Sequence, residues 1–259
     1  MNIVNLLSIV CVLVSAEARS QETMKPADSA NRTRLTDFSE PHLYTCYMEM
    51  YRGFSKNPKM GTGFLIHPRV ILTAGHNVAY YPTGRVKQVD AFFGSIDDST
   101  YRAKETLRLR RRKNKFFKFS YCMVSTLSRD FAIVILPDSS VYKQLGGHYK
   151  LDVLTSERLK ERTDSISLTG SPMDMSPHEI WTETKSGFGV YDEKCIKACL
   201  YTRPRNSGSP VWYHYNNALY VAGVHSRGNT VTCCGTHLLM NQKVVDKIEK
   251  WCSRAGISL

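Results

Sequence analysis

A serine in a tight turn is the residue of this sequence best suited to covalent chemistry. Residues 205–210 read Arg-Asn-Ser-Gly-Ser-Pro, and the apolar run that follows, Val211-Trp212-Tyr213, is typical of a strand. An exposed turn of this kind can present the Ser207 hydroxyl and backbone N–H groups to one point in space, as acyl transfer requires.

Two segments upstream supply the other groups that such chemistry needs. His76 ends the run Val-Ile-Leu-Thr-Ala-Gly-His, and Asp130 begins the run Asp-Phe-Ala-Ile-Val. An imidazole can take the serine proton, and a carboxylate can orient that imidazole. The ordinary alternatives are a histidine at a helix start, a carboxylate at a strand edge and a serine in a simple turn.

The order His, Asp, Ser and the sequences around these residues resemble those of chymotrypsin-like serine proteases. The resemblance spans roughly residues 40 to 255 and includes Gly61-Thr62-Gly63-Phe64 and Leu72-Thr73-Ala74-Gly75-His76. Within the family, Asn206-Ser207-Gly208-Ser209-Pro210 and the absence of a cysteine at position 77 are most similar to the glutamyl endopeptidase branch. The implied fold is all-β, with two six-stranded antiparallel barrels, an active site between them and a C-terminal helix.

The resemblance also implies a role for each residue. Ser207 would be the nucleophile, His76 the general base and Asp130 the orienting carboxylate, while the N–H groups of residues 205 and 207 would form the oxyanion hole. Thr202 and His225 fall on the positions that bind an acidic side chain, which implies cleavage after Glu, or Asp. The alternative for His225 is a histidine satisfied within the core. The backbone from Ser226 to Gly228 would pair with the substrate as an added strand.

Two departures from the family pattern bear on activity. Pro204 and Arg205 stand where the family has glycines, and losing one oxyanion-hole donor costs about 3 kcal/mol. A misdirected N–H at Arg205 would therefore give a slow enzyme or an inactive binding module. Asn206 is neutral, so the salt bridge that activates trypsin-like zymogens cannot form here, and any pro-segment must act in another way.

Short apolar runs separated by turns predict the rest of the architecture. Helical spacing of Val244, Val245, Ile248, Trp251 and Cys252, with Asn241 as a cap, predicts the C-terminal helix. The expected organisation has four parts: a signal peptide at 1–16, a pro-segment or flexible arm at 17–36, an N-terminal barrel with His76 and Asp130 at 37–145, and a C-terminal barrel with Ser207 and the helix at 146–259. Arg32 and Arg34 are candidate processing sites.

The apolar N-terminal run ends in Val14-Ser15-Ala16, which predicts a secreted protein, with a membrane anchor as the alternative. The chain has eight cysteines, and an oxidising compartment favours disulfides. A zinc site is the alternative for one cysteine-rich set, comprising Cys195, Cys199, Cys233, Cys234 and His237. We expect no metal and no cofactor.

The net charge is +12, and much of it lies between Arg108 and Lys118. This segment is either a solvated hairpin edge or a surface for anionic glycans, acidic proteins or nucleic acid. The sequence leaves three functions open: a secreted serine endopeptidase acting on polypeptides, a catalytically silent protease-like binding module, and a binder of anionic glycans or nucleic acid. After removal of the signal peptide, no membrane contact is expected.

Overall fold

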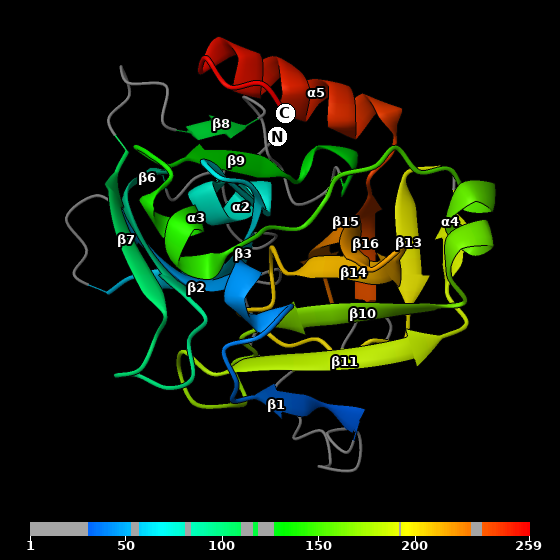
Figure 1. Ribbon diagram of the computed structural model, residues 1–259, viewed down its shortest axis with the longest axis horizontal. Helices are drawn as coiled ribbons and strands as arrows, with labels where there is room; N and C mark the ends of the chain where they lie inside the picture. The colour runs from blue at the N-terminus through cyan, green and yellow to red at the C-terminus, as the bar shows by residue number, and fades with distance from the viewer. Residues whose placement is uncertain are drawn as a thin grey trace, which may run out of the picture. The chain divides into compact units, whose positions relative to one another are not determined.

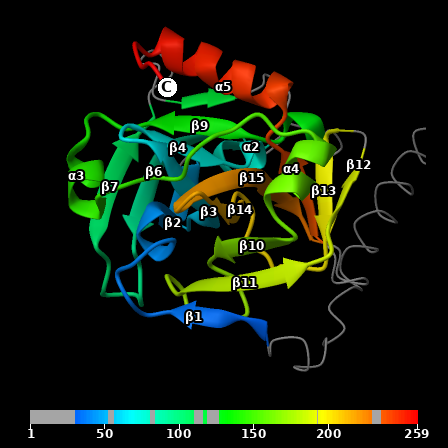
Figure 2. The same cartoon turned by 45° about the vertical axis from the view of Figure 1, so that its right-hand side comes forward.

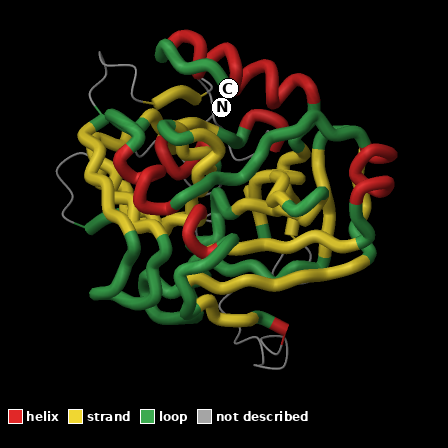
Figure 3. Tube along the Cα trace, viewed as in Figure 1, coloured by secondary structure: helices red, strands yellow, loops and turns green. Residues whose placement is uncertain are grey.

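The computed structural model describes most of the chain from Asn31 onward and is built mainly of β-strands (Figures 1 and 3). The described residues are 31–52, 57–80, 84–109, 116–118, 127–191, 193–228 and 235–259. The expected signal peptide and most of the expected arm lie outside these ranges.

The N-terminal sheet carries antiparallel strands in the order β5-β6-β2-β3-β4-β9-β8, with β7 paired to β6. Their side chains toward the core are almost entirely apolar, as a closed barrel requires. The strand bounds are β2 Thr45–Arg52, β3 Lys59–His67, β4 Val70–Thr73, β5 Ala79–Tyr80, β6 Gly84–Phe93, β7 Ala103–Arg108, β8 Phe116–Lys118 and β9 Ala132–Ile135.

The C-terminal sheet has the order β1-β11-β10-β14-β15-β16-β13-β12 and is also antiparallel. Both sheets contribute to one continuous apolar core. The strand bounds are β1 Thr33–Leu35, β10 Ser165–Gly170, β11 Ile180–Ser186, β12 Gly189–Tyr191, β13 Cys195–Ala198, β14 Pro210–Tyr215, β15 Ala218–Arg227 and β16 Gly235–Leu239.

The expectation of an all-β protein with two antiparallel barrel-like halves and a C-terminal helix is confirmed. Each sheet has eight described strands rather than six, because short strands extend each six-stranded core. These are β5 and β8 in the N-terminal sheet and β1 and β12 in the C-terminal one. The expected boundary between residues 145 and 146 falls in the connection from β9 to β10.

Helices are few and mostly short in the described part of the chain (Figure 3). The α-helices are α2 Gly75–Val78, α3 Ser140–Leu145, α4 Ser156–Arg162 and α5 Gln242–Arg254, and the 3-10 turns are η2 His42–Tyr44 and η3 Leu127–Arg129. As predicted, Asn241 caps α5, its side chain accepting the Val244 N–H at 3.1 Å. The helix lies over the side of the N-terminal sheet formed by β8 and β9 (Figures 1 and 2). Trp251 of the helix packs on Phe131, which precedes β9, with ring centroids 5.2 Å apart.

Residues 31–36 lie at the end of the expected pro-segment or flexible arm, and three of them form the strand β1. β1 pairs with β11, with Arg34 opposite Trp181, and lies at the edge of the C-terminal sheet (Figure 2). The preceding Arg32 is buried and forms two hydrogen bonds to Asp174, at 2.9 and 3.1 Å. Both candidate processing sites therefore lie in or beside a paired strand.

The segment that joins the two sheets is itself part of the core. Tyr149 is fully buried, and its hydroxyl lies 3.0 Å from the Thr45 hydroxyl. Its ring meets Phe64 of the N-terminal sheet edge-on at 5.5 Å and Trp212 of the C-terminal sheet at 6.5 Å. One side chain thus ties the connection to both sheets.

Cysteine pairing is only partly visible. Cys46 and Cys252 are buried thiols, and burial raises the pKa of Cys252 to about 12. Cys199 is disulfide-bonded, while Cys122, Cys233 and Cys234 lie outside the described ranges. The disulfide pattern therefore stays a prediction. No helix among the described residues is long and apolar enough to cross a membrane.

Candidate active site

The first two predicted residues meet because their strands are neighbours. β4 and β9 are antiparallel, with Thr73 opposite Ala132, so His76 after the one strand and Asp130 before the other reach the same point. His76 Nδ1 lies 2.8 Å from Asp130 Oδ2, and the His76 backbone N–H donates to Oδ1 at 2.9 Å. The imidazole position is therefore fixed at both its ring and its backbone.

Asp130 is buried, with 2% of its side chain exposed, whereas 20% of the His76 side chain is accessible. A third donor, the hydroxyl of Ser226 on β15, also binds Asp130 Oδ2. A buried carboxylate is costly unless it is hydrogen-bonded, and these contacts meet that requirement. Ser226, predicted only as a backbone contact for the substrate, thus links the C-terminal sheet to the His76–Asp130 pair.

The Ser207 turn is anchored to the N-terminal sheet. The Ser207 carbonyl accepts the Thr62 N–H at 3.0 Å and the Asn77 side-chain amide at 2.8 Å. Asn77 is the residue after His76, so the backbone of the Ser207 turn is bound by the direct neighbour of the histidine. Within the described contacts, no hydrogen bond joins the Ser207 hydroxyl to His76; such bonds are often long or poorly aligned in enzymes without substrate.

Gly208 shows why the turn needs its small residues. Its φ is +89°, a conformation that favours glycine, and a Cβ there would lie 2.2 Å from the Thr62 carbonyl oxygen. Its N–H donates to the His225 carbonyl at 2.8 Å. Gly208 therefore packs closely against Thr62 of the N-terminal sheet and is hydrogen-bonded to His225 of the C-terminal sheet.

Arg205 adopts the backbone conformation expected of the glycine it replaces. Its φ is +77°. The Pro204 carbonyl accepts the Met173 N–H at 2.9 Å, and the Arg205 carbonyl accepts the Thr62 hydroxyl at 2.9 Å. Since the 204–205 peptide is trans, the Arg205 N–H points away from the carbonyl that binds Met173. Both carbonyls around residue 205 are thus occupied elsewhere in the protein.

The residues predicted to bind an acidic side chain lie on β15 and beside its end. A Cβ on Gly228 would lie 2.5 Å from the Thr202 hydroxyl, so the two residues face each other directly. His225 is buried, and its Nδ1 lies 3.1 Å from Nδ1 of His237, opposite it on β16. Burial lowers the pKa of His225 well below its usual value and that of His237 to about 3, so both rings are neutral at pH 7.

Three contributors were missed in the sequence. His237 entered only in the zinc alternative, although it contacts His225; the pairing of β15 with β16 brings them together. Asn77 differs from the cysteine that trypsins have at this position, but the sequence does not reveal that its side chain binds the Ser207 carbonyl. Thr62, in the predicted Gly-Thr-Gly-Phe motif, contacts the turn through its N–H and hydroxyl. The described residues hold no cluster of three potential metal ligands.

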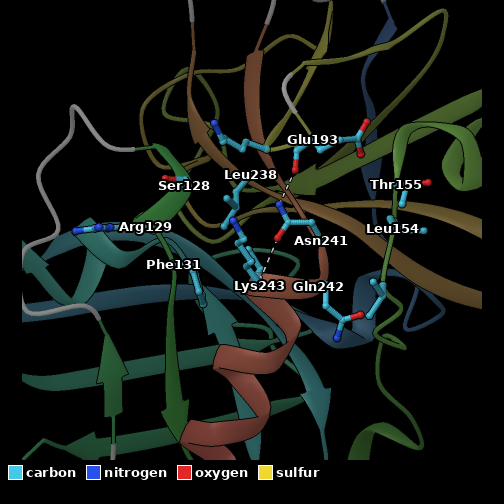
Figure 4. Close-up of a pocket in the computed structure, with 13 residues that line it drawn as sticks. Ser128, Arg129, Phe131, Leu154, Thr155, Glu193, Leu238, Asn241, Gln242 and Lys243 are labelled. Carbon is cyan, nitrogen blue, oxygen red and sulfur yellow. Dashed lines mark hydrogen bonds between the residues drawn. The ribbon is translucent and has the colours of Figure 1, made fainter.

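A separate cavity of about 610 Å³ lies between η3, β16 and the start of α5 (Figure 4). Its floor includes the buried side chains of Phe131, Leu154 and Leu238, and Asn241 spans one wall by binding the Glu193 carbonyl at 2.6 Å. Basic and acidic side chains share its rim, so no single ligand chemistry follows. Of the basic segment Arg108–Lys118, residues 110–115 lie outside the described ranges.

Solved structures of proteases share this fold. A Glu endopeptidase in complex with MPD aligns with a TM-score of 0.69 at 20% sequence identity, over 85% of this chain and 95% of its own. The protease Anisep from Arthrobacter nicotinovorans aligns at 0.65 and 12% identity, over 83% and 98% of the two chains. The thermostable serine protease AL20 from an extremophilic microorganism aligns at 0.65 and 10% identity, over 84% and 99%.

No family model matches the sequence, and no curated protein is similar to it by sequence. The structural likeness is nevertheless consistent across most of the length of each protease. The chain therefore has the chymotrypsin-like serine protease fold.

Proposed function

We propose that this protein is a serine endopeptidase in which Ser207, His76 and Asp130 hydrolyse peptide bonds. The observation that carries the proposal is the 2.8 Å contact between His76 and the buried Asp130, beside the anchored Ser207 turn. A carboxylate buried beside a partly accessible imidazole is the pairing that general-base catalysis needs.

Each group would then have a defined task. With Asp130 accepting the Nδ1 proton, the lone pair of His76 lies on Nε2 and takes the proton of Ser207 as its oxygen attacks the carbonyl carbon. The negative charge on the carbonyl oxygen would be stabilised by the N–H groups of Arg205 and Ser207. His76 then returns the proton to the leaving amine, and water hydrolyses the acyl-enzyme by the same relay.

The neutral histidine pair supports a preference for Glu, or Asp, before the cleaved bond. If His237 donates its Nδ1 proton to His225, the remaining proton of His225 lies on Nε2 and can be donated to a carboxylate. The Thr202 hydroxyl provides a second donor, and the missing side chain of Gly228 leaves room for that hydroxyl. The backbone from Ser226 to Gly228 would pair with the substrate strand.

Hydrolysis of matched peptides tests the proposal. Peptides that differ only in Glu, Gln, Lys or Phe before the cleaved bond should be cut by the wild type with Glu preferred, and not detectably by Ser207→Ala. Ser253→Ala, an exposed serine on α5, is the control and should match the wild type. Hydrolysis that survives Ser207→Ala, or a folded wild type that cuts none of the peptides, would contradict the proposal.

An inactive binding module is the second candidate from the sequence, and it requires a carbonyl at residues 204–205 to block the oxyanion hole. The bond from Met173 to the Pro204 carbonyl disfavours that arrangement. Secretion, guided by the N-terminal run at residues 1–16, and binding of anionic glycans by the Arg108–Lys118 segment remain proposals from sequence alone.

A further inference from the structure

Arg205 occupies a position where a side chain is unexpected. A φ of +77° is uncommon for a residue with a Cβ, so other contacts must hold it there. The side chain is not released to solvent, since only 8% of Arg205 is exposed. The question is therefore what its guanidinium does in the interior.

The guanidinium binds a turn that follows β10. Its Nη2 donates to the carbonyl of Met175 at 2.6 Å and to that of Pro172. These residues close the turn themselves, with the Met175 N–H donating to the Pro172 carbonyl at 3.3 Å. The guanidinium also interacts electrostatically with the hydroxyl of Tyr47 on β2. The side chain thus bridges the N-terminal sheet and the turn at 172–175.

The same turn binds the peptide that precedes Arg205. Met173 donates its N–H to the Pro204 carbonyl at 2.9 Å. One turn therefore fixes both the side chain of Arg205 and the peptide plane at 204–205. A flip of this peptide would break the Met173 bond and move the Arg205 backbone away from the position that its side chain holds.

A second buried arginine, Arg32, also binds the turn at 172–175. Arg32 pairs with Asp174 through two hydrogen bonds, and its guanidinium lies 4.3 Å from the centre of the Tyr201 ring. The turn is thus bound by two arginines, by Arg205 at its backbone carbonyls and by Arg32 at the Asp174 side chain. A turn held by these contacts can keep the 204–205 peptide in one orientation.

We infer that the Arg205 guanidinium is a positioning residue that locks the 204–205 peptide with its N–H toward the substrate oxyanion. The inference rests on the proposed function, because it assigns a role within that active site. Where the family relies on glycine, this chain combines a glycine-like backbone angle with side-chain bonds to the Pro172 and Met175 carbonyls.

Two substitutions, Arg205→Gly and Arg205→Ala, separate the effect of the backbone angle on activity from the effect of the guanidinium contacts. Glycine accepts the positive φ without strain but loses the guanidinium, and alanine loses the guanidinium and keeps the strain. We expect kcat to fall in both, by about tenfold or more, because full loss of one donor costs roughly 100- to 1000-fold. KM should stay within about threefold, since ground-state contacts are retained.

The readout specific to the oxyanion is the affinity for a peptide aldehyde, whose hemiacetal oxygen occupies the hole. This affinity should fall in parallel with kcat for both variants. Lys160→Ala, which removes a positive charge from an exposed position on α4, is the control and should leave kcat within about twofold. If Arg205→Gly keeps the wild-type kcat and aldehyde affinity, the proposal that the guanidinium positions the 204–205 peptide is refuted. Arg205→Gly tests the proposal by itself even if Arg205→Ala fails to fold. Failure of the proposed function looks different, because the wild type itself would then lack activity.

Discussion

Asp130 is the residue on which the site geometry depends most. It accepts hydrogen bonds from the ring and backbone of His76 and from the hydroxyl of Ser226. The first two hold the imidazole, and the third joins the two sheets at this point. An acceptor with these three donors fixes the histidine tautomer as well as its orientation.

Removing the charge of Asp130 should therefore lower kcat more than removing one of its hydrogen-bond donors. Asp130→Asn should lower kcat by roughly 10⁴-fold, because the amide stabilises the wrong tautomer of His76. Ser226→Ala should lower kcat by only about 10- to 100-fold, since one hydrogen bond to a charged group is lost. Steady-state kinetics of both variants test this order, which a structural role of Asp130 alone would not produce.

Thr202 gives a prediction about specificity. Thr202→Val keeps the shape and removes the hydroxyl, so kcat/KM for a Glu peptide should fall about 10- to 100-fold. The value for the matched Gln peptide should change by less than about threefold. Equal losses on both peptides would show that Thr202 does not recognise the carboxylate.

Among the secondary-structure elements, β1 and its neighbour Arg32 give a prediction about stability. Arg32 has 3% of its side chain exposed and pairs with Asp174, whereas Arg34, two residues on, is 38% exposed and pairs with Glu179 at 3.1 Å. Arg32→Ala should lower the free energy of unfolding by about 2 kcal/mol, because it removes the two hydrogen bonds between the buried guanidinium and the Asp174 carboxylate.

Arg34→Ala is the matched control in the same segment. An exposed ion pair contributes about 1 kcal/mol or less, so this variant should unfold near the wild-type midpoint in urea. Equal destabilisation by the two substitutions would show that β1 is held by its backbone pairing rather than by the Arg32 contact.

The elements that the sequence predicts well are those with a local signal. The apolar runs at Val70–Leu72 and Phe131–Leu136 lie within and around β4 and β9, and Asn241 caps α5 as expected. β1 has no such signal, because its three residues are mostly exposed and its partner strand is far away in the sequence. The helix α4, capped by the Thr155 side chain, has only one buried residue, Leu159, and so lacks the apolar spacing that predicts a helix.

The site shows the same division between local and long-range information. His76, Asp130 and Ser207 each lie in a motif that can be recognised in sequence. The positive φ of Arg205 and the pairing of His225 with His237 could not be predicted, because both depend on contacts across the fold.

At the scale of the whole molecule, the buried histidines predict how stability depends on pH. Burial lowers the pKa of His237 to about 3 and that of His225 well below 6.5, and His237 faces His225, which also interacts with His76 and Asp130. Both rings stay neutral in the folded protein, whereas the unfolded chain takes up protons below about pH 6.5. Stability is therefore fully present above pH 6.5 and is lost as the pH falls toward 3.

Urea unfolding at pH 6.5 and pH 4.5 measures this effect. His237 should contribute about 2 kcal/mol to the loss between these values, and His225 should add to the loss in the same direction. His237→Gln should show a smaller loss than the wild type, because one of the two titrating groups is gone. If His237→Gln loses as much stability between pH 6.5 and pH 4.5 as the wild type does, the assignment of a neutral, buried His237 ring is contradicted.

The most direct measurement of the central claim is to map where a fluorophosphonate reacts with the full-length protein. The reagent phosphonylates a serine only when a base and an oxyanion hole activate it. Peptide mapping by mass spectrometry should find a single adduct on Ser207, which disappears in His76→Ala although that variant keeps the serine. A folded wild type with no adduct, or with an adduct on another residue, would contradict the account.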